Sequence, residues 1–278
     1  MVNIWQSAAQ QKNVMEAYVV LRGVLFRGII AASFVALTSW VSPAAAVVQL
    51  AFVVDESGSV GSTNFGNMMQ GIHDGLETHL PIDGSFEVTV IKFSSSTTLV
   101  FAPTLISNQG HKDALLNAIL TAPYLAGSTN MHLALDLAVS EITGSVYFGT
   151  GASLINLATD GAPTNEAAAT QAAIDARNAG ITGLSAESIG AGGPTSYLAS
   201  IVFPGTSPGT IVNVGAGDPV PNPINQGFVI SIATFGDFSA AIDAKIEQTV
   251  AAATTEPGVL SMLGFGILTT GVLLRRRA

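Results

Sequence analysis

Residues 47–59 read VVQLAFVVDESGS, an apolar run that ends abruptly in a polar turn. The run is rich in β-branched residues, which is typical of a strand buried on both faces of a parallel sheet. The turn places Asp55, Ser57 and Ser59 directly after that strand. Ligands of open α/β sheets bind at the carboxyl ends of strands, so these three side chains are candidate ligand-binding residues.

Strand and helix patterns alternate along the chain on both sides of this stretch. Further strands are predicted over residues 86–93, 97–101, 153–159, 181–189 and 228–233. Helices are predicted from a cap at Ser62 or Thr63 to the break near Pro81, and over residues 109–120, 130–142, 166–179, 196–202 and 238–250. The alternation predicts an α/β fold with a doubly wound, mostly parallel central sheet and helices on both faces. Residues 204–223 are rich in Gly, Pro and Asn and are expected to form a long surface loop.

Two more oxygen-bearing side chains lie at predicted element boundaries. Thr129, in the segment GSTN, precedes a predicted helix. Asp160, in the segment ATDG, ends a second buried strand. Hydroxyl oxygens combined with carboxylates suit a hard cation such as Mg²⁺, which prefers octahedral coordination by oxygen.

These three segments, in this order, resemble the metal-ion-dependent adhesion site (MIDAS) of von Willebrand factor type A (vWA) domains. The resemblance covers roughly residues 48–250 and implies the Rossmann-like vWA fold, predicted here for residues 47–253. It implies that Ser57 and Ser59 coordinate a metal directly and that Thr129 does so directly or through water. It also implies that Asp55 and Asp160 hold metal-bound waters. Mg²⁺ is the expected ion, with Mn²⁺ and Ca²⁺ as alternatives.

The resemblance also implies how such a site is used. One coordination position stays open in the family, and an acidic residue of a protein or matrix ligand fills it. Ser128 stands where the family often has a second glycine, a difference that removes no ligand. The expected function is therefore metal-dependent binding or adhesion.

The N-terminus resembles a secretory signal peptide. Arg22 and Arg27 precede the apolar run 29–41, and the small residues 44–46 follow it. Cleavage is expected after Ala46, which makes residues 1–46 the signal peptide. The apolar run is shorter than the roughly 20 residues of a membrane-spanning helix. An N-terminal membrane anchor is the alternative, and Met15 is an alternative start.

The C-terminal segment, residues 254–278, resembles the PEP-CTERM sorting signal. Glu256-Pro257 precedes an apolar stretch over 259–274 and the basic cluster 275–277, although Thr255 replaces the first proline of the pattern. The resemblance implies recognition by an exosortase-type membrane protease. The domain would then reach the cell envelope, the cell surface or the extracellular matrix. A permanent membrane anchor with its arginines in the cytoplasm is the alternative.

Composition excludes several other classes of protein. The chain has no cysteine, which excludes disulfides and thiolate metal sites. Residues 47–257 hold four basic and eighteen acidic residues, a formal net charge of −14. Such a surface repels phosphates, so no nucleic-acid partner is expected. Contact with a membrane is expected only through the terminal segments.

No catalytic or organic-cofactor-binding residues are predicted. The histidines are scattered without an H-E-x-x-H pattern, and no nucleophile elbow is predicted. Asp55 follows a strand, as a phosphoryl-transfer aspartate would, but Ser57 stands where a second aspartate would be expected. A non-enzyme is therefore predicted. A Mg²⁺-dependent hydrolase of the cell envelope, acting on phosphate or carboxylic esters, is the alternative.

Overall fold

The computed structural model describes residues 46–254. The predicted signal peptide, apart from Ala46, and the sorting segment beyond Thr254 lie outside the described residues. Between residues 46 and 254, none of the helices combines the length and the apolar character that a membrane crossing requires.

A seven-stranded sheet forms the centre of the described domain. Its order is β3-β2-β1-β4-β5-β7-β6, and every neighbouring pair is parallel except β2 and β3. The strands are β1 (Val48–Asp55), β2 (Phe86–Phe93), β3 (Thr97–Leu105), β4 (Ser153–Thr159), β5 (Gly183–Ile189), β6 (Thr210–Val212) and β7 (Phe228–Ile232). The sheet is mostly parallel, as predicted, and the opening apolar run forms its central strand, β1.

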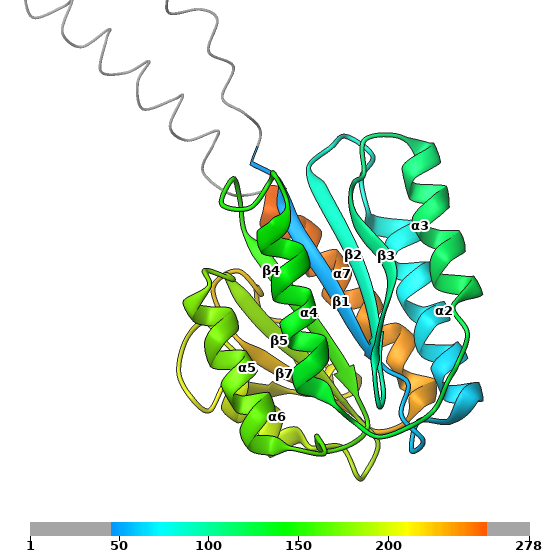
Figure 1. Cartoon of the computed structure of the whole chain (residues 1–278), viewed down its shortest axis with the longest axis vertical. Helices are drawn as coiled ribbons and strands as arrows, with labels where there is room; N and C mark the ends of the chain where they lie inside the picture. Colours follow the sequence, from blue (N-terminus) through cyan, green and yellow to red (C-terminus); the bar gives the residue numbers. More distant parts are fainter. Residues whose placement is uncertain (1–45, 255–278) are drawn as a thin grey trace, which may run out of the picture. The chain divides into compact units, whose positions relative to one another are not determined.

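Helices cover both faces of this sheet. One face carries α2 (Gly61–His79), α3 (Gln109–Thr121) and α7 (Phe238–Thr254). The other carries α4 (Met131–Gly144), α5 (Glu166–Asn178) and α6 (Thr195–Ile201). Figure 1 shows α4 in front of the sheet and α7 behind it. Two short 3₁₀ turns, η1 (Val214–Ala216) and η2 (Phe235–Asp237), lie in the connections near β7.

The two layers of helices explain why β1 is apolar at every position between Gln49 and Asp55. Successive side chains of a strand point to opposite faces of the sheet. A central strand covered on both faces therefore needs apolar residues at its odd and its even positions. Leu50, Phe52 and Val54 belong to the core beneath α2, α3 and α7. Ala51 and Val53 belong to the core beneath α4, α5 and α6. All eight residues of β1 are buried.

Three local predictions were wrong. The helix α2 begins at Gly61 without a side-chain cap, so Ser62 and Thr63 lie inside its first turn rather than capping it. Strand β3 continues to Leu105 instead of ending at residue 101, because its pairing with β2 continues through two register shifts to Leu105, opposite Glu87. The expected loop over 204–223 contains β6 and η1; three residues are too few for β6 to show a periodic pattern.

Candidate metal centre

The two candidate aspartates lie at one edge of the sheet. β1 and β4 are parallel neighbours, with Val54 opposite Ala158. Asp55 is the last residue of β1, and Asp160 directly follows β4. Their strands therefore deliver both carboxylates to the carboxyl edge of the sheet, as the sequence pattern predicted.

Asp55 is buried and holds the turn that follows it. Its Oδ1 accepts a hydrogen bond from the Ser57 amide at 2.7 Å, which folds the chain back after the strand. Its Oδ2 accepts a hydrogen bond from the Thr159 hydroxyl at 2.6 Å. Burial raises the pKa of Asp55 to about 6, and the hydrogen bonds from Thr159 and Ser57 oppose that rise. Two neutral donors thus hold the carboxylate in place, while the loss of solvent destabilises its charged form.

A row of hydroxyls connects this turn to the second aspartate. The Oγ atoms of Ser57 and Ser59 lie 3.1 Å apart. The Ser59 hydroxyl donates to Asp160 Oδ1 at 2.8 Å. Burial also raises the pKa of Asp160, although the hydrogen bond from Ser59 lowers it. In residues 46–254, no Lys, Arg or His side chain forms an ion pair with Asp55 or Asp160.

Thr129 reaches the same place from the Thr129 loop, the segment 122–130 between α3 and α4. The Thr129 amide donates to the Thr164 hydroxyl at 3.1 Å, and the Thr164 amide donates to the Thr129 carbonyl at 2.9 Å. A Cβ placed on Gly161 would lie 3.6 Å from Ser59 Oγ and 3.8 Å from Thr129 Oγ1. The two hydroxyls therefore flank one glycine, and the missing side chain leaves the space beside them open.

All five predicted residues therefore meet at this edge of the sheet. They offer hydroxyl and carboxylate oxygens only, the donor chemistry that Mg²⁺, Mn²⁺ and Ca²⁺ share. The hydroxyls have lone pairs that could coordinate a cation, and a cation would stabilise the charged form of the two carboxylates, which burial disfavours. The residues fit a hard divalent cation.

Two hydroxyls that support the site were not predicted from the sequence. Thr159 orients Asp55, and Thr164 fixes the backbone of Thr129. Thr159 had a recognisable signal, because it is a polar residue at the end of an apolar strand and directly precedes Asp160. Thr164 lies 35 residues from its partner, and nothing in the sequence joins the two.

Two other groups of residues resemble functional sites, one as a catalytic sequence motif and one as a cluster of possible metal ligands. Residues 205–209 read GTSPG and match the letters of the G-x-S-x-G elbow, which the sequence prediction overlooked. The Ser207 side chain, however, lies in the loop after α6 and bonds the Ser200 carbonyl, and no helix follows it. His73, Asp74 and Glu77 lie together on α2, and the two carboxylates are exposed. The Nδ1 atom of His73 is hydrogen-bonded to Asp74, an ordinary contact between surface groups.

The fold and this strand-end oxygen cluster define the class of protein. The family model of the von Willebrand factor type A domain matches residues 49–213, and the chain belongs to that family. Its α/β, Rossmann-like fold is that of vWA domains. Comparison with curated protein sequences gives no significant match.

Solved structures with the same fold include a thread matrix protein and a pilus adhesin. Proximal thread matrix protein 1 from the mussel byssus superposes with a TM-score of 0.56 at 17% identity, over 74% of this chain and 48% of that one. Another structure of it has a zinc-occupied MIDAS motif, with a TM-score of 0.56 at 16% identity over 74% and 48% of the chains. The pilus adhesin SpaC from Lactobacillus rhamnosus GG gives 0.56 at 15% identity, over 73% and 30%. This chain spans about half of the mussel protein and less of SpaC, and such low identities show the fold alone.

Proposed function

We propose that this vWA domain is a binding module that holds a divalent cation at Asp55, Ser57, Ser59, Thr129 and Asp160. One observation carries the proposal: two carboxylates with raised pKa values are joined by a row of serine hydroxyls and have no basic partner among the described residues. Every donor is an oxygen, which suits a hard divalent cation; Mg²⁺ is the ion we expect, with Mn²⁺ and Ca²⁺ as alternatives.

Each residue has a distinct part in this proposal. The hydroxyls of Ser57, Ser59 and Thr129 would hold the ion, and the carboxylates of Asp55 and Asp160 would balance its charge and orient the serines. When bound, the ion supplies an electrophilic position that a carboxylate can fill. Gly161 keeps the space beside Ser59 and Thr129 free of a side chain.

The partner is proposed to be an acidic residue of a protein or matrix ligand. A carboxylate would complete the coordination shell, and the charge-assisted contact would fix its orientation. The domain itself is strongly acidic, so its surface alone would repel such a partner. Binding of an acidic partner should therefore depend on the metal rather than on the surrounding surface.

Export to the cell envelope, cell surface or extracellular matrix completes the proposal. It rests on the signal-like N-terminus and on the C-terminal segment with its PEP-CTERM pattern, for which an exosortase-type protease is the proposed partner. A thread matrix protein and a pilus adhesin with the same fold are consistent with an extracellular binding role.

Calorimetry with Mg²⁺ and Mn²⁺ tests the metal site. The unaltered protein should bind one ion, and Asp160→Ala should abolish binding while the circular dichroism spectrum stays unchanged. Asp175→Ala is the matched control, because Asp175 is an exposed aspartate on α5 that accepts a hydrogen bond from Gln171. Equal metal affinity in the Asp160 and Asp175 variants would refute the site.

A pull-down from the producing cell's envelope, with and without EDTA, tests the binding role. Partners captured only without EDTA, and lost with Asp160→Ala, would support it. Metal-dependent phosphatase or esterase turnover that is lost in Asp55→Asn would instead establish the hydrolase.

A further inference from the structure

The Thr129 loop carries a proposed ligand but has no regular secondary structure of its own. Its backbone is also unusual at two consecutive residues, with φ 59° at Ala126 and φ 130° at Gly127. A Cβ on Gly127 would lie 2.6 Å from Ser95 Oγ, so the loop passes very close to the chain after β2. Since loop conformations of this kind persist only when their surroundings enforce them, the contacts that hold this loop decide where Thr129 lies.

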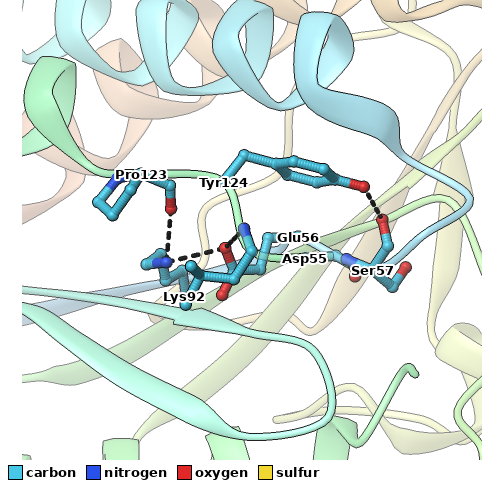
Figure 2. A network of polar contacts seen from close by, with 7 residues as sticks. Asp55, Glu56, Ser57, Lys92, Pro123 and Tyr124 are labelled. Atoms are coloured by element: carbon cyan, nitrogen blue, oxygen red, sulfur yellow. Dashed lines mark hydrogen bonds and ion pairs between the residues drawn. The ribbon is translucent and has the colours of Figure 1, made fainter. Parts of the chain in front are cut away.

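A buried ion pair lies directly beneath the loop (Figure 2). Glu56, between two site residues in the sequence, and Lys92, near the end of β2, are each 1% exposed. Lys92 Nζ lies 2.8 Å from Glu56 Oε2 and donates to the Pro123 carbonyl at 2.6 Å. The same Glu56 oxygen accepts the Leu125 amide at 2.9 Å. The pair therefore fastens one carbonyl and one amide of the loop.

Tyr124, between these two fastened residues, joins the loop to the site itself. Its hydroxyl donates to the Ser57 carbonyl at 3.1 Å. Its ring packs against Phe65 of α2, with centroids 5.8 Å apart. Two residues before Thr129, the Gly127 carbonyl accepts the Gly58 amide at 2.9 Å. Together with the bond from the Leu125 amide to Glu56, the loop and the turn after β1 are thus bonded to each other at three points.

Burying an ion pair costs desolvation energy that apolar side chains of similar size would avoid. Apolar residues, however, could not satisfy the Pro123 carbonyl and the Leu125 amide. The pair does both, and Glu56 is covalently adjacent to Asp55 and Ser57. Its geometry therefore links the place of the loop to the place of the turn.

We infer that Glu56, Lys92 and Tyr124 are positioning residues that set Thr129 against Ser57 and Ser59 by holding the 122–130 loop. They contribute no metal ligand and act by holding the loop against the turn after β1. The inference rests on the proposed function and deepens it.

Two altered proteins test the inference. Tyr124→Phe removes one hydroxyl and keeps the ring on Phe65. Glu56→Gln with Lys92→Met removes both charges together, so no unpaired buried charge remains. The matched control is Glu187→Gln with Lys245→Met, which removes the other buried pair, joined at 2.6 Å between β5 and α7. β5 lies three strand spacings from β2, about 14 Å across the sheet.

The first measurement is amide hydrogen exchange without metal. In both test variants, exchange over residues 122–130 should quicken while the core strands keep their protection. The control should leave this loop unchanged. Unchanged hydrogen exchange of the loop in both test variants would overturn the inference, whatever the result of the metal-binding measurement.

The second measurement is Mn²⁺ affinity, by calorimetry, in the unaltered and the Thr129→Val backgrounds. With Thr129 present, Tyr124→Phe should weaken binding about fivefold, the size of one neutral hydrogen bond. The double variant should weaken it about tenfold or more. In the Thr129→Val background neither change should weaken Mn²⁺ binding further. A merely structural effect would instead lower Mn²⁺ affinity by the same factor in both backgrounds.

The outcomes separate this inference from the proposed function. A looser loop with unchanged Mn²⁺ affinity, while Asp160→Ala still abolishes binding, overturns the positioning role and leaves the metal site standing. Equal losses of Mn²⁺ affinity with Thr129 present and in the Thr129→Val background also overturn the positioning role and leave the metal site standing. No Mn²⁺ binding by the unaltered protein removes the proposed function and, with it, this inference.

Discussion

Asp55→Asn should stabilise the metal-free domain above pH 6 and at the same time abolish its binding of metal. Burial raises the pKa of Asp55 from 3.8 to about 6, so the folded domain holds this proton more tightly than the unfolded chain. The contribution of Asp55 to stability therefore falls as the pH rises from 3.8 to 6. Above pH 6 the folded domain bears the full free-energy cost of the buried, ionised carboxylate. A shift of about two units corresponds to roughly 3 kcal/mol.

Asparagine carries no charge and avoids that cost. Its carbonyl oxygen can still accept the Ser57 amide, and the Thr159 hydroxyl can turn to the Gly161 carbonyl, which lies 3.0 Å away. Allowing about 1 kcal/mol for weaker hydrogen bonds, the variant should gain roughly 2 kcal/mol of stability at pH 8.

Denaturant unfolding in EDTA at pH 4 and pH 8 measures this effect. Relative to the unaltered protein, the Asn variant should gain about 2.5 kcal/mol between the two pH values, because the cost is about 0.5 kcal/mol at pH 4 and about 3 kcal/mol at pH 8. Asp175→Asn, at an exposed position, should show no such change. Adding Mn²⁺ at 100 times its Kd should reverse the order, because it stabilises only the unaltered protein, by about 2.7 kcal/mol. A difference that does not widen with pH would refute the reasoning.

Three further predictions follow from single features of the structure. Gly127→Ala should cost about 2–4 kcal/mol in thermal unfolding, because its backbone has a left-handed φ and a Cβ would meet the chain at 2.6 Å. Thr159→Val, at a buried position, removes the 2.6 Å hydrogen bond to Asp55, so the pH at which Mn²⁺ affinity falls by half should rise by about one unit in a calorimetric pH series. Lys245→Met alone should destabilise by about 3–5 kcal/mol in urea unfolding, because it leaves Glu187 charged and buried, whereas adding Glu187→Gln should restore most of the loss.

The sequence predicted the parts of this fold that depend on local pattern. The apolar runs of β1 and β4 are buried on both faces, and such runs suffice to place a strand in the interior of a parallel sheet. Their carboxyl ends share one edge, so the convergence of Asp55 and Asp160 followed from the predicted topology. The shared position of the two aspartates was therefore within reach of sequence reasoning, whereas the five-residue set as a metal site remains a prediction from the resemblance.

What depends on long-range pairing was not predictable in this way. Glu56 and Lys92 lie 36 residues apart, and each alone resembles an ordinary surface charge. The conformation of the Thr129 loop depends on contacts with β2, the turn after β1 and the loop after β4, none of which leaves a periodic signal. The edge strand β6 has only three residues, too few for an alternating pattern.

The buried acids of this domain show why the oxygen cluster should take its cation from solution. Glu56 and Glu187 are both buried, and each has a buried lysine within 2.8 Å. Asp55 is equally buried but is held only by an amide and a hydroxyl, and Asp160 beside it has no basic partner within residues 46–254. Glu87 is also buried without a lysine, and its two oxygens accept from Gln49 Nε2 and the Ser145 hydroxyl. What distinguishes Asp55 is the second carboxylate beside it, since the nearby charge of Asp160 adds to burial in raising its pKa. Two neighbouring carboxylates without a basic partner repel each other, so we expect a cation to balance them. If the stability of the domain showed the same pH dependence in EDTA as in saturating Mn²⁺, the charge of Asp55 would be balanced within the chain and no cation would be needed.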